Sequence, residues 1–253
     1  MVRINKYLAK CNLGSRRKVE KFITDGHISV NGKKMTNLAK QIDEKSDIVK
    51  FKGKTIKPIE EKVYIILNKP PKYIVSTKDE FGRKTIYDLL PKFKIKLFYV
   101  GRLDYMSEGL VLLTNDGSVA NKIIHPRNKI PKTYKIKIKG HLDNNQIKQL
   151  RDGIVINNKK TLPAKVFVNK TDNNYSSLKI IIKEGRKRQI RRMIKAVGSE
   201  VLRLKRLQIG NVKLKKMPPG TWRYLKINEV KKLKQLIKES KDENRNNRQK
   251  KGR

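Results

Sequence analysis

Asp104 is the carboxylate whose surroundings are best suited to chemistry. It ends the sequence YVGRLD at residues 99–104, and a second apolar run covers residues 110–113. The pattern predicts that Asp104 lies on a loop between two buried strands, which is the usual setting of an active site because rigid strands hold the loop in place. The alternative is a purely structural role, since Asp is also common in turns and at helix starts.

A cluster of cations near residue 190 could give such a carboxylate a charged partner. The segment EGRKRQIRRM covers residues 184–193, and Gly198 is suited to end a helix after it. One face of that helix would be apolar, with Ile190, Met193, Ile194 and Val197. The opposite face would be basic, with Arg188, Arg192 and Lys195. Arg191 lies between the faces, so it could reach a carboxylate while its neighbours face phosphate; the alternative is a surface helix with solvated cations.

Tyr134 begins the most regular strand pattern of the chain. The stretch TYKIKIKG at residues 133–140 alternates apolar and polar side chains, with Tyr134, Ile136 and Ile138 on one face. Residues 164–168 and 178–182 alternate in the same way, which favours an antiparallel sheet. Tyr134 is either the first core residue of its strand or an aromatic group that contacts a base, an interaction worth ~1–3 kcal/mol in nucleic-acid binding.

Residues 1–57 have the pattern of a compact unit with two short helices and a small sheet. Ile4, Tyr7, Leu8 and Cys11 share one helical face. Ser15 is suited to cap a second helix, which ends at Asp25-Gly26. Asn31-Gly32 predicts a type I′ hairpin, and residues 47–51 predict a further strand. The cations Arg16, Arg17, Lys18 and Lys21 cross the start of the second helix, where backbone N–H groups also favour phosphate.

The net charge points to a polyanionic partner. Lys and Arg number 64 and Asp and Glu number 22, which gives a formal charge of +42. Such an imbalance is self-repulsive unless a polyanion neutralises it, and nucleic acid binds Lys and Arg with release of counterions. The alternative for part of the charge is the codon bias of an AT-rich genome, because Lys, Asn and Ile are all abundant.

Several other classes of function find no support in the sequence. The single cysteine, Cys11, excludes an intramolecular disulfide, and the three histidines show no metal-ligand spacing. We therefore expect no metal site. No Gly-rich phosphate loop is present either, so we expect no cofactor. No apolar run approaches the ~20 residues of a membrane span. The N-terminal sequence MVRINKYLAK carries no secretory signal, so we expect a cytoplasmic protein without a membrane partner.

Two sets of motifs resemble known families. The segment GSRRKVEKFITDGHISVNGK at residues 14–33 resembles the S4 RNA-binding module. The segments GRLDYMSEGLVLLTNDG at residues 101–117 and HPRNKIPKTYKIKIKG at residues 125–140 resemble the pseudouridine synthases, in the branch that modifies ribosomal RNA through an S4 module. Together with EGRKRQIRRM, these motifs extend over most of the chain.

The resemblance implies an α+β protein in four segments. Residues 1–57 would form a small S4-like RNA-binding domain, and residues 58–62 would form a linker. Residues 63–230 would form the catalytic domain, built on a mixed, mostly antiparallel sheet. Residues 231–253 lose their apolar periodicity after Leu236-Ile237, so we expect a frayed helix followed by a basic, disordered tail.

The implied function is the isomerisation of one uridine in ribosomal RNA to pseudouridine by a monomer, acting on ribosomal RNA or a ribosomal precursor particle. The implied catalytic residues are Asp104 as the nucleophile, Tyr134 beneath the target uracil and Arg191 as the partner of Asp104. The expected substrate-binding residues are Arg102, Lys132, Arg186, Arg188, Arg192 and Leu204. The expected RNA-binding residues of the S4-like domain are Arg3, Ser15, Arg16, Arg17, Lys18 and Lys21. EGRKRQIRRM is more similar to the enzymes of the large subunit, which act on 23S rRNA, than to the small-subunit enzyme.

Two other classes of function remain open. A non-catalytic S4-type assembly factor would explain the charge and residues 1–57, but not the joint presence of GRLD and QIRR. A DNA-binding protein would need a recognition helix with half-site symmetry, and no segment has that pattern.

Overall fold

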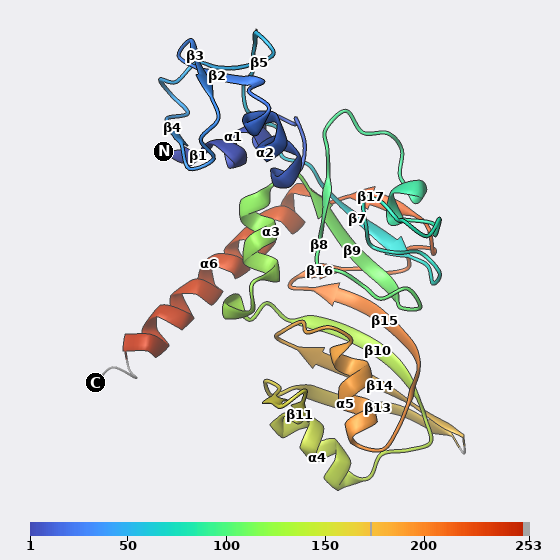
Figure 1. Cartoon of the computed structure of the whole chain (residues 1–253). Helices are drawn as coiled ribbons and strands as arrows, with labels where there is room; N and C mark the ends of the chain where they lie inside the picture. Colours follow the sequence, from blue (N-terminus) through green and yellow to red (C-terminus); the bar gives the residue numbers. More distant parts are fainter. Residues whose placement is uncertain (173, 250–253) are drawn as a thin grey trace. The chain divides into compact units, whose positions relative to one another are not determined.

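The computed structural model describes residues 1–172 and 174–249, with side chains as far as residue 240. The chain divides into two compact units; in Figure 1 most of the first is blue, and the second runs from cyan to red. The first unit contains residues 1–63 and also residues 93–97, and the second contains residues 64–92 and the chain from residue 98 onward. The division along the sequence falls next to the expected linker, but the membership of residues 93–97 in the first unit was not expected.

The first unit combines two helices with short strands. Its elements are β1 (Val2–Arg3), α1 (Ile4–Lys10), α2 (Arg16–Thr24), β2 (Ile28–Val30), β3 (Lys33–Met35), β4 (Gln41–Ile42), β5 (Val49–Phe51) and β6 (Lys54–Thr55). Four strands form an antiparallel sheet in the order β3-β2-β5-β6, and β1 pairs with β4. The apolar face predicted for α1 is confirmed, because Ile4, Tyr7 and Leu8 are buried in one core with both helices and the sheet.

Local sequence signals explain how this unit forms. The Ser15 hydroxyl accepts a hydrogen bond from the Lys18 N–H at 3.3 Å, as expected of an N-cap. Asn31 and Gly32 have φ values of 50° and 81°, the positive values that a type I′ turn requires, so the predicted hairpin is confirmed. Asn12 holds residues 93–97 in the unit, because its side chain accepts from the Lys96 N–H at 2.7 Å and donates to the Lys94 carbonyl at 2.9 Å.

The second unit is built on a nine-stranded sheet. Its strands are β7 (Tyr64–Lys69), β8 (Phe98–Val100), β9 (Glu108–Thr114), β10 (Lys132–Lys139), β13 (Lys165–Asp172), β14 (Tyr175–Ile182), β15 (Val201–Ile209), β16 (Val212–Lys213) and β17 (Trp222–Tyr224). Seven follow one another in the order β13-β14-β10-β15-β9-β7-β17, while β8 pairs with β9 and β16 pairs with β15. Among the strand pairings of this sheet in the described residues, only that of β15 with β9 is parallel. The prediction of a mixed, mostly antiparallel sheet is confirmed.

The remaining elements connect or cover these strands. They are η1 (Ile86–Leu89), α3 (Gly117–Ile124), η2 (Pro126–Asn128), α4 (Asn144–Asp152), β11 (Val155–Ile156), β12 (Lys159–Lys160), α5 (Gln189–Ala196) and α6 (Ile227–Gln249). Residues 73–76 form no strand, and Ile74 makes only an isolated bridge with Thr85.

Helices α3 and α6 cover one face of the sheet at β7 and β9. The shared core contains Tyr64, Ile66, Leu110 and Leu112 from the strands, Val119, Ala120 and Ile123 from α3, and Leu233 and Ile237 from α6. Helix α3 begins at Gly117, directly after Asp116. The Asp116 carboxylate caps this helix by accepting from the N–H groups of Ser118 and Val119 at 3.0 and 3.1 Å.

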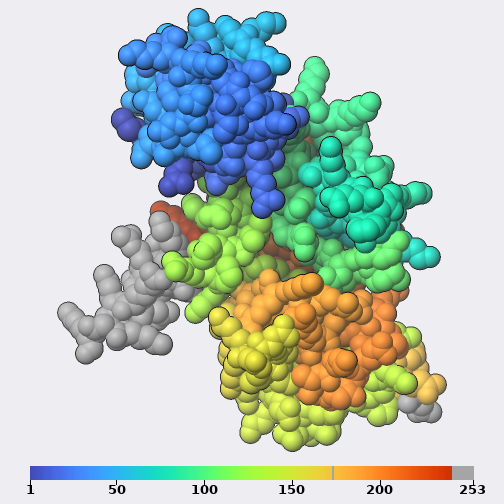
Figure 2. All heavy atoms as spheres, viewed as in Figure 1, coloured from blue at the N-terminus to red at the C-terminus, as the bar shows by residue number. Residues whose placement is uncertain are grey.

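Helices α4 and α5 lie against the other half of the sheet. Helix α4 contacts β13 and α5 contacts β15, and both helices stand in front of the strands in Figure 1 and form outer atoms of the yellow and orange part of Figure 2. The apolar face predicted for α5 is confirmed, because Ile190, Met193, Ile194 and Val197 are all buried. The strand residues beneath alternate as predicted, with Tyr134, Ile136 and Ile138 buried on β10.

The C-terminal segment is more ordered than its composition suggests. Helix α6 runs to Gln249, so it contains the helix expected from residue 231. Residues 250–253 lie outside the described part of the chain, and the disordered tail expected after the helix stays a prediction. Leu233 and Ile237 are buried one turn apart, and each burial contributes roughly 1.5–3 kcal/mol to holding the helix. No helix in the described residues has both the length and the apolar character that a membrane crossing requires.

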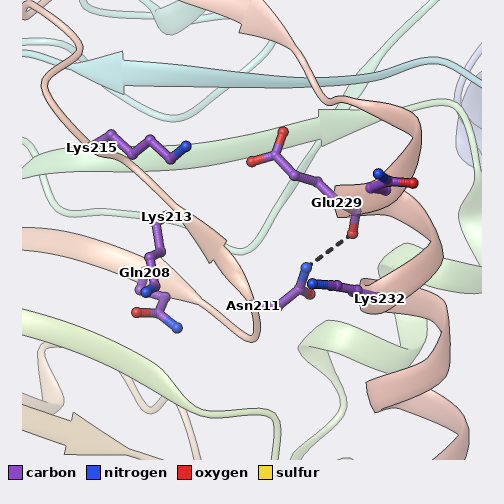
Figure 3. Close-up of a pocket in the computed structure, with 7 residues that line it drawn as sticks. Gln208, Asn211, Lys213, Lys215, Glu229 and Lys232 are labelled. Atoms are coloured by element: carbon purple, nitrogen blue, oxygen red, sulfur yellow. Dashed lines mark hydrogen bonds between the residues drawn. The ribbon is translucent and has the colours of Figure 1, made fainter.

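A pocket of about 440 Å³ marks the joint between α6 and the β15–β16 turn. Figure 3 shows side chains from both elements around it, including Gln208, Lys213 and Lys232. The Asn211 amide donates to the Glu229 carbonyl at 3.0 Å, and Arg223 holds the Glu229 carboxylate through two hydrogen bonds of 2.7 and 2.8 Å. These polar groups fix the first turn of α6 to the sheet.

Gly109 allows β9 and β15 to approach closely, so Gly109→Ala should be strongly destabilising. Its φ is +106°, and an added Cβ would lie 2.3 Å from the Arg206 carbonyl oxygen and 2.7 Å from the Arg206 nitrogen. Both are backbone atoms, so the two strands would have to separate. We expect a loss of about 3 kcal/mol or more from overpacking and backbone strain together.

Urea unfolding of Gly109→Ala and Gly82→Ala provides the measurement and its control. Gly82 has a φ of +69°, but no described atom lies within 4 Å of an added Cβ. Its replacement should therefore cost only the backbone strain, roughly 1–2 kcal/mol. Equal losses for the two variants would contradict the close approach.

Candidate active site

The loop that carries Asp104 leaves the sheet where two strands share one edge of β9. Strand β15 pairs with the first two residues of β9, Glu108 and Gly109, and β8 pairs with its last three. Residues 101–107 connect β8 to β9, so they emerge at the gap between β8 and β15. Gly101 has a φ of +78°, which turns the chain away directly after β8. The predicted loop between two strands is confirmed.

Asp104 is half-buried, and the loop around it is closed by a main-chain hydrogen bond. The Ser107 N–H donates to the Asp104 carbonyl oxygen at 3.0 Å. Leu103 and Ser107 are buried on either side, whereas the intervening Tyr105 and Met106 side chains are exposed. The loop is thus anchored by the buried Leu103 and Ser107. Asp104 lies between the buried Leu103 and the exposed Tyr105.

Lys69 holds the second half of this loop from inside the protein. Its side chain is fully buried, and its Nζ donates to the carbonyl oxygens of Pro70, Tyr105 and Ser107 at 2.9, 3.1 and 2.6 Å. Burial lowers the pKa of Lys69 to about 8, against the opposing effect of the Asp104 and Glu108 carboxylates. One ammonium group therefore uses its three N–H bonds to fix the path of the chain next to Asp104.

Glu108 follows the loop and is itself buried and paired. Both of its carboxylate oxygens accept from the Arg203 guanidinium, through Nε and, at 3.1 Å, through Nη2. The Arg203 side chain is largely exposed, so the pair joins a buried carboxylate to a cation at the surface. Because Glu108 already has a cation, Asp104 is the carboxylate of this region that remains available for chemistry.

Tyr134 and Arg206 lie side by side on neighbouring strands near the loop. Tyr134 on β10 is directly opposite Arg206 on β15, and Arg206 is directly opposite Gly109 on β9. Residues directly opposite one another project from the same face of a sheet. Leu204 projects from this face two residues before Arg206, and all three side chains are at most 8% exposed. The sheet thus brings the expected Tyr134 and Leu204 to one face, beside a cation that the sequence analysis did not identify.

Arg206 reaches the first half of the Asp104 loop. Its Nε donates to the Leu110 carbonyl at 2.7 Å, and its Nη1 lies 3.5 Å from the Arg102 carbonyl, at the limit of a hydrogen bond. Its Nη2 is buried and has no hydrogen-bond partner among the described residues. An unpaired, buried guanidinium N–H next to the loop leaves one strong donor for an anionic group.

The expected ion pair between Arg191 and Asp104 is absent from this structure. Arg191 is half-buried on α5, and its Nη1 donates to the Val201 carbonyl at 2.8 Å. No ion pair involving Asp104 occurs in the described chain. The boundary position of Arg191 on its helix agrees with the sequence pattern, but pairing with Asp104 stays a prediction for the RNA-bound protein.

The Glu184 carboxylate holds the segment before α5 in place and pairs with Arg186. The buried Glu184 carboxylate accepts from the Gln189 amide at 2.8 Å and from Arg186 Nε at 3.1 Å. The other two Arg186 nitrogens donate to the Lys159 and Lys160 carbonyls at 2.8 and 2.6 Å. The Arg186 guanidinium thus ties β12 to the start of α5, and its expected contact with substrate stays a prediction.

Lys132 lies on β10 two residues before Tyr134 and is mostly buried. The pKa of Lys132 is lowered to about 8, first by burial and then by the positive charge of Arg206, while the Glu184 carboxylate opposes both. Lys132 is thus close enough to Arg206 and Glu184 to sense both charges. Its position near the Tyr134 face agrees with its expected place, and its contact with substrate stays a prediction.

The other expected RNA contacts are mostly at the surface. Arg102 and Arg188 are exposed and Arg192 is half-buried. In the first unit, the exposed residues of the expected set are Arg3, Ser15, Arg16, Arg17, Lys18 and Lys21. Exposure makes these side chains accessible to phosphate, and their roles stay predictions.

Lys69 and Arg206 are the site residues that the sequence analysis missed. Asn68-Lys69-Pro70-Pro71 has the composition of a strand break, but β7 includes Asn68 and Lys69 and is buried along its whole length. A lysine that continues an apolar strand needs polar partners, and backbone carbonyls of a nearby loop can provide them.

The comparisons with known proteins agree with this architecture. Residues 2–49 match the S4 domain family, and residues 63–196 match the RNA pseudouridylate synthase family. An uncharacterized RNA pseudouridine synthase of Aquifex aeolicus is 42% identical over 92% of this chain and 93% of its own length. The ribosomal large subunit pseudouridine synthase B of Bacillus subtilis is 38% identical over 96% of this chain and 99% of its own length. A crystal structure of a pseudouridylate synthase, 31% identical, superposes with a TM-score of 0.66 over 92% of this chain and 100% of that one.

These matches define the class of protein as an RNA-modifying isomerase. The chain belongs to the RNA pseudouridine synthase family, and its first unit is an S4 RNA-binding domain.

Proposed function

We propose that this protein converts one specific uridine of ribosomal RNA, in the large-subunit 23S rRNA, to pseudouridine, with Asp104 as the nucleophile. The observation that carries the proposal is the Asp104 loop, fixed by Lys69 on the inside and opened to the surface at Tyr105 and Met106. The assignment to 23S rRNA is supported by the Bacillus subtilis relative, whose name specifies the large ribosomal subunit.

The reaction rearranges one nucleotide without a change in composition. The N1–C1′ bond breaks, the uracil turns, and a C5–C1′ bond forms; C5 loses a proton and N1 gains one. The target nucleotide has to leave its base stack before the reacting atoms become accessible. The Asp104 carboxylate attacks either C1′ of the sugar or C6 of the base and is released when the new bond is complete, so no oxidant, reductant or group donor takes part.

Each neighbouring residue has a role that follows from its position. Tyr134 is suited to contact the flipped uracil, because its ring lies on the sheet face next to the loop. Arg102 is exposed beside Asp104 and can fill the space that the flipped nucleotide leaves. A guanidinium is always protonated, so the approach of Arg191 on RNA binding would orient Asp104 and keep it ionised.

The direct test is to map pseudouridine in ribosomal RNA after incubation with the protein. Unmodified ribosomal RNA and precursor particles are treated with wild-type protein or Asp104→Asn, and pseudouridine is then located by carbodiimide adducts that stop reverse transcription. We expect one new stop in 23S rRNA with the wild type and none with the variant. A stop in 16S rRNA would reject the subunit assignment, and tight binding without any stop would favour a ribosome assembly factor.

A further inference from the structure

The face of the sheet opposite Tyr134 is open on β10, β13, β14 and β15. On β14 every second residue is buried, whereas Tyr175, Ser177, Lys179 and Ile181 are only half-buried. On β10 the same alternation leaves Lys135, Lys137 and Lys139 outside. Helices α4 and α5 contact these strands and bury apolar side chains of their own, so we infer that they cover the side on which the strand residues are buried. Four neighbouring strands therefore present one uncovered face.

Lysines on this face stand directly opposite one another. Lys135 on β10 is opposite Lys179 on β14 and also opposite Lys205 on β15. The next row pairs Lys137 with Arg203. Like charges directly opposite on neighbouring strands destabilise a sheet. No salt bridge involves Lys135, Lys137, Lys179 or Lys205 in the described part of the chain. The fold thus maintains a set of unneutralised cations at a cost.

Two aromatic rings hold the ammonium groups close to the sheet. Lys179 Nζ lies 4.6 Å from the centre of the Phe167 ring, and Lys137 Nζ lies 3.3 Å from the centre of the Tyr175 ring. Phe167 is directly opposite Lys179 on the edge strand β13, so it ends the first row. A cation attracted to a ring face stays near it, which concentrates the charge on the sheet surface. We call Lys135, Lys137, Lys179, Lys205, Arg203 and Phe167 the lysine face.

The lysine face is separate from the candidate active site. Tyr134 and Leu204 alternate along their strands with Lys135 and Lys205, so they project to the opposite side. Lys205 is directly opposite Glu108, whose side of β9 continues as Leu110 and Leu112 beneath α3 and α6. The lysine face is thus the open continuation of the side that α3 and α6 cover.

We propose that the lysine face is a second RNA-contact surface, which binds the phosphates of a helical segment of the substrate RNA away from the target uridine. This proposal rests on the proposed function in one respect only, namely that the ligand is RNA. Four strands spaced ~4.8 Å apart make a flat surface ~14 Å wide, which suits the phosphates of a helical stem rather than a single base.

Charge selects RNA over a protein partner for this surface. The acidic groups at its margins are Glu108, already paired with Arg203, Asp172 at the end of β13, and Glu200, whose carbonyl accepts from the Lys139 N–H. The Phe167 ring is 43% exposed, but it lies on the edge strand with the Lys179 ammonium over it, so the surface lacks the apolar centre that a protein interface needs. Contacts of this kind are independent of sequence and depend strongly on salt.

A triple variant tests the proposal against a matched loss of charge. The face variant carries Lys135→Gln, Lys137→Gln and Lys179→Gln. The control variant carries Lys148→Gln, Lys231→Gln and Lys238→Gln, which removes three exposed lysines from α4 and α6. For each protein we would measure the Kd for an unmodified 23S rRNA domain over a range of salt, the rate of pseudouridine formation at saturating protein, and the melting temperature.

We expect the face variant to bind at least about tenfold more weakly at low salt, with a slope of log Kd against log salt smaller by about 2 to 3. The control should stay within about threefold of the wild type, since scattered lysines make few phosphate contacts. The rate at saturation should be unchanged, and the melting temperature should equal or exceed that of the wild type because opposed charges have been removed.

Equal salt slopes for the face variant and the control would overturn the proposal, as would weaker binding accompanied by a lower melting temperature. Binding is measured separately from catalysis, so the two conclusions can fail separately. Face-dependent binding without any pseudouridine would reject the proposed function and leave this surface in place.

Discussion

The Asp104→Asn protein is expected to bind 23S rRNA as tightly as the wild type and to form no measurable pseudouridine. An amide is a poor nucleophile, and loss of an enzyme nucleophile lowers turnover by about 10⁴-fold or more. The fold of the loop should persist, because the hydrogen bond from Ser107 to Asp104 joins main-chain atoms. Affinity should not fall, because the substitution removes a negative charge from a site that binds phosphates. Release of tritium from C5 of uridine, under single-turnover conditions, measures the reaction directly.

Asp152→Asn is a suitable control for that experiment. Asp152 is exposed at the end of α4, so its replacement removes the same charge from the same unit without touching the loop. It should retain full activity. If Asp104→Asn kept activity within tenfold of the wild type, Asp104 would not be the nucleophile. If Asp104→Asn lost both activity and RNA binding, the result would indicate a damaged site.

Local patterns predicted the parts of the fold that local interactions stabilise. The alternation in β10 and β14 and the apolar face of α5 depend on periods of two and 3.6 residues, which are visible in any single segment. The Ser15 cap and the hairpin at Asn31-Gly32 depend on side chains that act within a few residues. These predictions succeeded because the determining interactions lie within the predicted segment.

Elements that depend on distant contacts were missed. Helix α3 was not predicted, because Asn115-Asp116-Gly117 has the composition of a turn. In the structure Asp116 is the N-cap of this helix. Helix α6 was expected to fray because its composition is charged. Its stability comes from Leu233 and Ile237, which pack against a core made by strands more than 100 residues earlier in the chain. A single amphipathic segment does not reveal the core that it will cover.

The same distinction applies to the candidate site. Asp104 and Tyr134 could be located because a motif and a strand pattern mark their positions. The partners of the charged groups could not be predicted, because they depend on tertiary contacts between distant segments. The phase of α5 placed Arg191 at the boundary of the helix, yet its guanidinium meets the Val201 carbonyl. Lys69 and Arg206 became visible only when their strands were paired with β9 and its neighbours.

Lys69→Met is expected to lower the rate at saturating RNA by about 10²-fold, because a displacement of about 1 Å at a reacting group has an effect of that size. Methionine fills the buried space of the lysine stem but donates no hydrogen bond. The carbonyl oxygens of Pro70, Tyr105 and Ser107 would each lose one hydrogen bond, although Tyr105 would keep the one from the Lys72 N–H, at a cost of about 1–3 kcal/mol in the free energy of unfolding. The affinity for RNA should change little, and Lys92→Met, at an exposed position, should change none of these quantities.

The pH dependence distinguishes a positioning role of Lys69 from a merely structural one. The pKa of Lys69 is about 8 in the folded protein, whereas that of an ordinary lysine is 10.5. Between pH 8 and pH 10.5 the unfolded chain therefore binds more protons than the folded protein. The free energy of unfolding should rise with pH across this range. The rate at saturating RNA should fall over the same range, because the neutral amine has two N–H groups for three carbonyls.

In Lys69→Met the decline in rate above pH 8 should disappear. Lys132 also has a pKa of about 8, but Lys132→Met should retain the decline, since Lys132 makes no hydrogen bond to the loop in the described chain. A decline that survives in Lys69→Met and disappears in Lys132→Met would assign the titration to Lys132 and reject the role of Lys69 as the group that positions Asp104.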